Sequence, residues 1–289
     1  MILRNHRILF SGFPEFRIRP IGDLQWGSSG FDEDLYWQCY EETVGDPNAI
    51  TIGMGDMSDN FRPTIRERFG ASMSGDLSAQ IQMDDMHRDH MDKMIKKLKL
   101  DILFKAGHGC VGLLDGHHFF KYANGDTSTQ YLCRVLKIPY LGEMSAFIRL
   151  LFSRKDSKSG NPSLIIHAQH GEGGAQYISS DIAKLERKTV PSFIADIYLR
   201  GHSTKAYSGG SDMLYMSEAE PPGLLSKSVV FANTGGFMRG YLEGEVTYVE
   251  KKMMAPAKLG YIVVNAKMTN QRDHNGVHRK NMFRLSVTS

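Results

Sequence analysis

The chain of 289 residues has little cysteine, only two tryptophans and no long hydrophobic run. Its three cysteines are odd in number and form no Cys-x-x-Cys pair, which argues against a disulfide framework and a structural zinc site. No apolar stretch approaches the roughly 20 residues of a membrane-spanning helix. The opening residues, MILRNHRILFSGF, lack the apolar segment of a secretory signal. We therefore expect a soluble cytoplasmic protein, in the host cytoplasm if a phage encodes it, with no membrane partner.

A strong excess of charge is also lacking. The chain has 35 Lys and Arg against 32 Asp and Glu, a net charge of +3. Proteins dedicated to duplex nucleic acid usually carry a strong basic stripe, so this charge neither requires nor excludes a nucleic acid partner. The one obvious basic run, KKLKL at 96–100, follows methionines at helical spacing and is typical of the solvated side of an amphipathic helix. The composition leaves the oligomeric state open.

What is present is a pattern of short strands that end in polar residues. Residues 18–24 and 49–54 are apolar stretches that predict strands, and they lead to Asp23 and Asp56. Between them, residues 31–44 start with acidic residues and continue with apolar residues at helical spacing. A strand, a helix and a strand in succession imply parallel pairing of the two strands.

The same pattern continues along the chain. We expect a helix over 78–98, one or two strands within 101–114, a helix capped by Thr127 or Ser128, and strands within 163–171 and 194–206. The tail from Lys227 alternates β-branched and aromatic residues with glycines, which predicts antiparallel strands of a second sheet. No internal repeat or linker is visible, so we expect a single domain over residues 1–289, with 227–289 completing the second sheet.

Five of the predicted strand ends present groups that bind metals or transfer protons. They are Asp23 with Gln25, Asp56, His117 with His118, His170, and His202. Each is weak alone, because a lone Gly-Asp is usually a turn and a lone buried histidine is usually a core residue. Ligands of open α/β sheets, however, collect beyond the carboxyl ends of the strands. Carboxylates together with neutral imidazoles suit divalent transition metals.

The order of these groups resembles the calcineurin-like metallophosphoesterases. That family has Asp-x-His, Gly-Asp-x-x-Asp/Asn, Gly-Asn-His-Glu/Asp, a His followed by Gly, and Gly-His-x-His. The corresponding blocks of this chain are GDLQ at 22–25, GDMSDN at 55–60, GHHF at 116–119, HAQHG at 167–171 and GHST at 201–204. Further on, FANTGG at 231–236 is similar to the Asn-Pro-Gly-Ser turn of the family. The resemblance implies a four-layer α/β/β/α sandwich of two mixed β-sheets flanked by helices.

The resemblance also implies a metal site. Asp56 would bridge two divalent ions, Mn²⁺ in the first place, with Fe²⁺, Zn²⁺ or Mg²⁺ as alternatives. The other ligands would be Asp23, Gln25 and Thr204 on the first ion, and His117, His170 and His202 on the second. His118 would be the catalytic histidine, and His167 is the alternative to His170. Arg62, just after the second block, is a candidate for phosphate binding.

Three departures bear on this expectation. Gln25 and Thr204 stand where the family has histidines of the first ion, and Phe119 replaces an acid that supports the catalytic histidine. A chain with a single ion is therefore an alternative to one with two. The expected activity is metal-dependent hydrolysis of phosphoric esters, either phosphodiesters or phosphomonoesters, by a metal-activated hydroxide. A nuclease is one form of it, and a degenerate member that only binds partners is the rival. His87 and His90, three apart on the predicted helix, are interpreted as surface residues.

Overall fold

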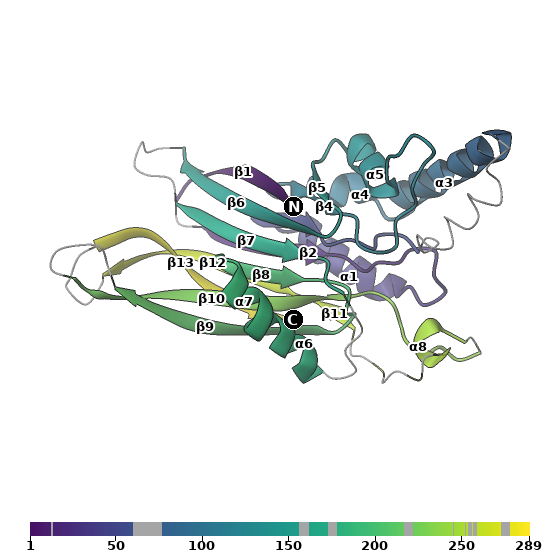
Figure 1. The fold of residues 1–289 in the computed structure, drawn as a ribbon. Coiled ribbons are helices and arrows are strands. Elements are labelled where there is room, and N and C mark those ends of the chain that lie inside the picture. Colours follow the sequence, from purple (N-terminus) through teal and green to yellow (C-terminus); the bar gives the residue numbers. More distant parts are fainter. Residues whose placement is uncertain are drawn as a thin grey trace.

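The computed structural model describes most of the chain. The described residues are 1–12, 14–59, 77–155, 162–172, 178–216, 222–244, 246–251, 253, 256, 259–272 and 278–289. They form two β-sheets with helices on the outside (Figure 1).

One sheet has six strands in the order β13-β12-β2-β3-β4-β5. Its strands are β2 (Glu15–Ile21), β3 (Ala49–Gly53), β4 (Cys110–Leu114), β5 (Tyr140–Gly142), β12 (Val263–Arg272) and β13 (His278–Thr288). The strands β2 to β5 run parallel, while β12 pairs antiparallel with both β2 and β13. Parallel strands need crossover connections, and the helices after β2, β3 and β4 supply them.

The other sheet has seven strands in the order β1-β6-β7-β8-β10-β11, with β9 also paired to β10. They are β1 (Ile2–Phe10), β6 (Ser145–Arg154), β7 (Ser163–Gln169), β8 (Ile197–Arg200), β9 (Ala206–Met216), β10 (Leu224–Gly236) and β11 (Gly260–Tyr261). Here β7, β8 and β10 run parallel to one another, whereas β6, β9 and β11 each pair antiparallel with a neighbour. Both sheets are therefore mixed.

The main core lies between the two sheets. Its buried side chains come from both, as shown by Ile18 and Ile52 on one side and Ile148 and Ile166 on the other. Burial of apolar surface stabilises a fold by about 25 cal/mol per Å², so this shared interior contributes substantially to stability. The two-sheet, helix-flanked architecture that the sequence resemblance implied is confirmed.

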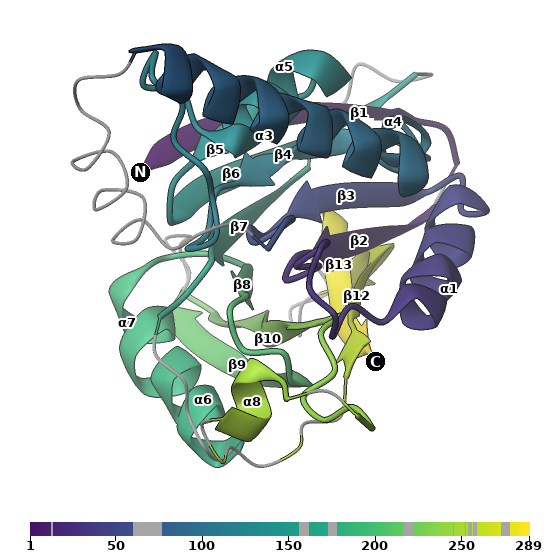
Figure 2. The same cartoon turned by 90° about the vertical axis from the view of Figure 1, so that its right-hand side faces the viewer.

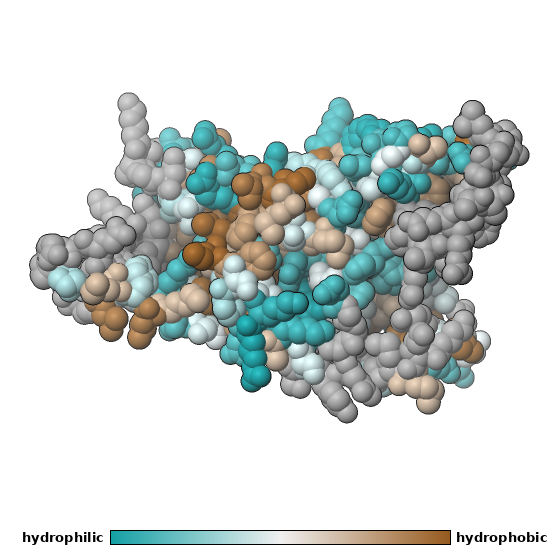
Figure 3. Space-filling view, in the orientation of Figure 1, coloured by the Kyte–Doolittle hydropathy of each residue, from teal (hydrophilic) through white to brown (hydrophobic). Residues whose placement is uncertain are grey.

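Helices cover the outer faces of both sheets (Figure 2). A second core joins the six-stranded sheet to α1 (Glu33–Val44), α3 (Leu77–Lys97), α4 (Leu100–Leu103) and α5 (Ser128–Leu136). A third core joins the seven-stranded sheet to α6 (Ile178–Lys184), the π-helix η1 (Leu185–Thr189) and α7 (Val190–Ser192). The short α8 (Tyr248–Lys251) follows β10. Figure 3 shows apolar side chains gathered over β6 and β7, where the outer face is only partly covered.

Local signals explain where the helices begin. Thr127 caps α5, because its hydroxyl accepts from the Gln130 amide at 3.1 Å and the Gln130 side chain accepts from the Thr127 amide at 2.8 Å. This reciprocal capping box satisfies two backbone donors at once. Asp32 caps α1 by accepting from the Leu35 amide at 3.2 Å. Of the two caps that the sequence offered for α5, the structure selects Thr127.

Two expectations from the sequence need correction. The apolar residues after α3 begin with the short helix α4, and a strand follows only at Cys110, because Leu100, Leu103 and Phe104 are buried at helical spacing. The tail 227–289 contributes to both sheets: β10 and β11 join the seven-stranded sheet, and β12 and β13 extend the six-stranded one. Among the described helices, not one combines the length and the apolar character that crossing a bilayer requires.

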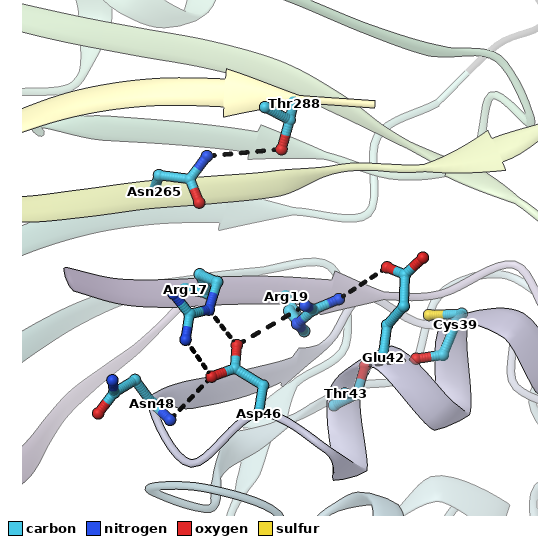
Figure 4. A network of polar contacts seen from close by, with 9 residues as sticks. All are labelled: Arg17, Arg19, Cys39, Glu42, Thr43, Asp46, Asn48, Asn265 and Thr288. Carbon is cyan, nitrogen blue, oxygen red and sulfur yellow. Dashed lines mark hydrogen bonds and ion pairs between the residues drawn. The ribbon is translucent and has the colours of Figure 1, made fainter.

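A buried ion-pair network lies at the amino ends of β2 and β3 (Figure 4). Asp46 accepts from the guanidinium of Arg17 and from the Asn48 amide at 2.9 Å, and Arg19 lies 3.6 Å away. Burial alone would raise the pKa of Asp46, but the hydrogen bonds from Arg17 and Asn48 and the two positive charges hold it below its ordinary value. The negative charge at this end of the sheet is fully compensated.

Candidate metal centre

The expected site residues follow the carboxyl ends of five strands. Asp23, Asp56 and His117 come after β2, β3 and β4, which are parallel neighbours in the six-stranded sheet. His170 and His202 come after β7 and β8, which are parallel neighbours in the other sheet. Parallel strands present their carboxyl ends at one edge, so each sheet brings its own residues together. The loops of the two sheets then meet at the same end of the sandwich.

Backbone strain is concentrated in these loops. Seven described residues other than glycine have a positive φ, and four of them are Asp23 (50°), Gln25 (46°), Asp56 (53°) and His202 (67°). Such conformations cost of order 1–3 kcal/mol each and persist where the surrounding structure enforces them. Backbone hydrogen bonds do so here, because the Asp23 amide donates to Gly55 O at 2.9 Å and the Gln25 amide to Asp56 O at 3.0 Å. Strain of this kind is common at functional sites and supports this edge as the candidate site.

Two glycines of the motifs allow the loops to approach closely. A Cβ on Gly116 would lie 2.3 Å from Oδ1 of Asp56, and one on Gly55 would lie 2.7 Å from Nδ1 of His170. Both residues also have a positive φ, which a glycine adopts at no steric cost. No other residue type fits at either position without moving a site side chain.

Four side chains form one cluster at the centre of the site. Asp56, His117, His170 and His202 each offer a ligand atom, and these atoms all lie within 4.8 Å of one another. Nδ1 of His117 is 3.2 Å from Nδ1 of His202, and Nε2 of His170 is 3.1 Å from Oδ2 of Asp56. The ring of His117 meets those of His170 and His202 edge to face.

The donor atoms suit a divalent transition metal. His170 donates its Nδ1 proton to Met54 O at 2.7 Å, since a carbonyl only accepts, and this leaves Nε2 as the lone-pair nitrogen. Nε2 of His170 and Oδ2 of Asp56 are buried and make no other hydrogen bond with a described residue. Oδ1 of Asp56, in contrast, accepts from the amides of His117 at 2.6 Å and His118 at 2.8 Å. One carboxylate oxygen is thus held by the backbone while the other faces three imidazoles, and the residues fit an ion.

Electrostatics keep Asp56 ionised and make His170 basic when no ion is bound. Burial alone would raise the pKa of Asp56, but the contact with His170 and the amide of His118 hold it far below its ordinary value. Burial would lower the pKa of His170, but the carboxylates of Asp56 and Asp23 and the carbonyl of Met54 raise it to about 9. A cation between the two would replace the proton on His170.

The other two histidines of the cluster are held in their neutral forms. Burial and the neighbouring imidazole of His170 lower the pKa of His117, and the same causes lower that of His202 to about 4. Neutral imidazole is the form that binds metals. Burial raises the pKa of Asp23 to about 7, although the charge of His170 opposes this shift.

Asp23 adjoins the cluster without belonging to it. Its Oδ2 accepts from the His202 amide at 2.9 Å, and its buried Oδ1 has no hydrogen-bond partner among the described residues. Thr204 lies next to it, because a Cβ on Gly236 would contact Cβ of Asp23 at 3.0 Å and Cγ2 of Thr204 at 3.1 Å. Gln25, in the same loop as Asp23, is buried, with its backbone bonded to Asp56. These three are the residues expected on the first ion.

His118 lies at the rim of the cluster, toward solvent. Its Nδ1 lies 3.4 Å from Oδ1 of Asp59, and its side chain is 21% exposed. Asp59 matches the second block of the family, but the sequence pattern assigns it no role. Asp59 is the carboxylate placed to orient the ring of His118. The interaction is not visible in the sequence, since the two residues come from different loops.

The structure distinguishes the two histidines that competed for one position in the sequence. His170, which follows β7, is in the cluster. His167 lies within β7, where it is buried and stacks on Phe193 with ring centroids 4.2 Å apart. Of these two histidines, only His170 is placed to bind an ion. Arg62, the candidate for phosphate binding, lies outside the described residues.

The interpretation of His87 and His90 as surface residues was wrong. Both are half-buried: His87 stacks on Phe120 at 4.3 Å, and His90 packs on Trp26 at 4.6 Å and contacts the Ser58 hydroxyl at 3.0 Å. Helix α3 therefore packs onto the loops that carry Gln25, Asp56 and His118. The helical spacing of the two histidines was the available signal, because residues three apart share one face.

Two buried residues hold the site loops from behind. Asn233 in β10 donates its side-chain amide to Ser203 O at 2.6 Å and Lys205 O at 2.5 Å, on either side of Thr204. Asp115, just before the two histidines, accepts from the hydroxyls of Thr127 at 2.7 Å and Tyr140 at 2.5 Å. Such supports fix the orientation of the residues that bind a metal.

Comparison with known proteins adds little to this geometry. Neither known protein families nor curated protein sequences match the chain. Among solved structures, Vps29 of Chaetomium thermophilum is similar at a TM-score of 0.29 and 10% identity, over 94% of this chain and 96% of that one. The same protein in complex with a RaPID-derived cyclic peptide gives a TM-score of 0.23 at 9% identity, over the same shares. The sheet order and the core define the fold independently of these matches.

Proposed function

We propose that this protein is a metal-dependent hydrolase of phosphoric esters, a member of the calcineurin-like metallophosphoesterases. The observation that carries the proposal is the convergence of Asp56, His117, His170 and His202 within 4.8 Å. Two of these residues follow strands of the six-stranded sheet, and the other two follow strands of the opposite sheet. A bound divalent ion supplies positive charge for the phosphoryl oxygens and activates water near neutral pH.

The donor set favours one strong ion site. Three imidazoles and a carboxylate suit Zn²⁺, Fe²⁺ or Mn²⁺, and the ligands are already gathered. The neighbouring set of Asp23, Gln25 and Thr204 offers a carboxylate, an amide and a hydroxyl, which are poorer donors for such metals. We infer that the histidine cluster would bind one ion tightly and that Asp23, Gln25 and Thr204 would hold a second ion more weakly.

His118 is the proposed general acid. It lies beside the cluster, is partly exposed, and is oriented by Asp59 at 3.4 Å. A histidine in this position protonates the leaving alkoxide, a role worth about 10²–10⁴ in rate. Asp56 would hold the ion through Oδ2, while its Oδ1 accepts from the amides of His117 and His118 and so fixes the turn that carries them. These two hydrogen bonds therefore fix the position of His118 relative to His117.

The substrate class is a phosphoric ester, with phosphodiesters and phosphomonoesters both admitted. Nucleic acid belongs among the candidate substrates, although the net charge of +3 gives no strong basic stripe to hold a phosphate backbone. A test uses the chelated protein reloaded with Mn²⁺, with p-nitrophenyl phosphate, bis-p-nitrophenyl phosphate and a single-stranded oligonucleotide. Turnover that disappears on chelation and in Asp56→Asn supports the proposal. The control variant Asp46→Asn changes a buried carboxylate at the opposite end of the sheet and should retain turnover.

A second candidate is a binding protein that kept the fold and lost hydrolysis. It is favoured by one observation, namely that Asp23, Gln25 and Thr204 lie outside the four-residue cluster. This candidate predicts that the protein binds one ion per chain and hydrolyses none of the three substrates. Measuring metal content and turnover on the same sample separates it from the hydrolase.

A further inference from the structure

The loops that carry His170 and His202 share a buried support on their far side. Arg200 is the last residue of β8, directly before Gly201 and His202, and only 3% of it is exposed. Its Nη2 donates to Glu172 O at 2.7 Å, two residues after His170. One guanidinium therefore joins the loop after β7 to the loop after β8.

A carboxylate of α6 completes this support. Asp181 is fully buried, its Oδ1 lies 3.6 Å from Nη1 of Arg200, and its Oδ2 accepts from the Ser203 hydroxyl at 3.1 Å. Ser203 directly follows His202. Asp181 thus contacts both Arg200 and the loop beyond His202. Through it, helix α6 is joined to the loop that carries one of the proposed metal ligands.

The fit between these groups is close. A Cβ on Gly171 would lie 2.6 Å from Nε of Arg200, so only a glycine after His170 leaves room for the guanidinium. Gly171 also has a φ of +86°. The position of the Arg200 side chain therefore requires a glycine directly after His170.

We propose that Arg200 and Asp181 form a positioning brace that sets the separation of the two histidine loops and thereby the metal affinity of the cluster. The proposal rests on the metal site proposed above and names residues that no motif marks. Buried ion pairs are weak evidence for stability, but groups that orient metal ligands typically change metal affinity 10- to 100-fold. The brace is therefore expected to act on binding more than on folding.

The test measures Co²⁺ binding to the full-length apoprotein by its visible absorption, together with the thermal unfolding of the apoprotein. Asp181→Asn should raise the Kd for Co²⁺ about 10- to 100-fold and shift the absorption band, because His202 loses its fixed position. Ser203→Ala removes only the hydroxyl bond and should raise the Kd less. The matched control is Asp46→Asn, whose carboxylate is also buried and also lies 3.6 Å from an arginine, Arg19, but at the opposite end of the strands.

The outcomes are distinct. A raised Kd and a shifted band in Asp181→Asn or Ser203→Ala, with both unchanged in Asp46→Asn, support the brace. If the wild type binds Co²⁺ and the Asp181 and Ser203 variants bind it equally well with the same spectrum, the brace is refuted while the metal site stands. If Asp181→Asn does not fold, Ser203→Ala decides the question by the same readouts. A wild type that gives no Co²⁺ band contradicts both the metal site and the brace.

Discussion

The two ends of the parallel strands treat buried charge in opposite ways. At the amino end, Asp46 is surrounded by Arg17, Arg19 and the Asn48 amide, and its charge is compensated (Figure 4). At the carboxyl end, Asp56 and Asp23 are both fully buried. Oδ2 of Asp56 contacts the titratable imidazole of His170 at 3.1 Å, and Oδ1 of Asp23 has no hydrogen-bond partner among the described residues.

This difference supports the proposed metal site at the carboxyl end. The charge of Asp56 is balanced by the imidazole of His170, whose proton a cation could replace, and one buried oxygen of Asp23 has no hydrogen-bond partner among the described residues. The carboxyl end also carries the positive-φ residues Asp23, Gln25, Asp56 and His202. A carboxylate balanced by a titratable imidazole coincides here with backbone strain, and both support the cation site proposed at this end.

The largest expected effect is that of Asp56→Asn. An amide in place of the carboxylate removes the anionic donor of the cluster and its contact with His170, so metal-dependent turnover should fall to the background rate. Initial rates with bis-p-nitrophenyl phosphate, measured beside Asp46→Asn, check this. Equal losses of turnover in Asp56→Asn and Asp46→Asn would contradict the proposal that the carboxyl end alone carries the active site.

The next largest effect is that of His118→Ala. Loss of the general acid should lower kcat about 10²–10⁴-fold while the Kd for Mn²⁺ stays the same, because His118 lies outside the four-residue cluster. Asp59→Asn should lower kcat less, since it changes only the orientation of His118. Both kcat and the Kd for Mn²⁺ are measured for each of the two variants. A His118→Ala protein with the wild-type kcat would contradict the proposal that His118 is the general acid.

A third prediction concerns His167, a buried histidine with no carboxylate beside it among the described residues. Burial lowers its pKa to about 4 from an ordinary 6.5, so the folded state binds fewer protons than the unfolded state in that window. Stability is therefore fully present above pH 6.5 and is lost as the pH falls toward 4, by about 3 kcal/mol in all. His167→Met should move the acid unfolding midpoint to lower pH. An unchanged midpoint, followed by circular dichroism, would contradict this.

His170 should behave in the opposite way in the apoprotein. Its pKa is raised to about 9 by Asp56 and Asp23 against the opposing effect of burial, so the folded state holds the proton more tightly than the unfolded state. This stabilisation is present below pH 6.5 and is lost as the pH rises through about 9. Chemical unfolding of the apoprotein between about pH 6 and 10 measures it. If the His170→Gln apoprotein loses the same stability over this pH range, the loss does not come from His170 and the prediction is contradicted.

The smallest of these effects belongs to the amino end. Asp46→Asn removes charge-assisted hydrogen bonds from Arg17, worth about 1.5–3 kcal/mol for interactions with a charged partner. The free energy of unfolding should fall by that order while metal affinity stays unchanged. Urea unfolding of the apoprotein together with a Mn²⁺ titration tests the two statements. A change in metal affinity would show that the two ends are coupled.

Much of this site could be predicted from the sequence because its groups follow strand ends. The period of two in strands and the following Gly-Asp or Gly-His steps are local signals that place these groups at strand ends. The resemblance to the metallophosphoesterases then suggested Asp56, His117, His170 and His202 as ligands, with His167 as the alternative to His170. The capping of α5 by Thr127 is equally local. The order of the strands is not, because it depends on which chain segments pair over long distances.

The supporting residues could not be predicted for the same reason. Asp59 contacts His118, Asp181 contacts Arg200, and Asn233 contacts the loop of Thr204, each across large separations in the chain. None of them stands in a periodic pattern that identifies its partner. Likewise, the tail beyond Lys227 alternates as strands do, but alternation does not specify which sheet a strand joins.

The central claim is that one edge of the sandwich holds a divalent cation. Diffraction from a crystal soaked in Zn²⁺, recorded at the zinc absorption edge, tests it most directly. We expect an anomalous peak about 2.0–2.2 Å from Nε2 of His170 and Oδ2 of Asp56, with His117 and His202 completing the shell. Clear density for all four side chains with no anomalous peak among them would contradict it.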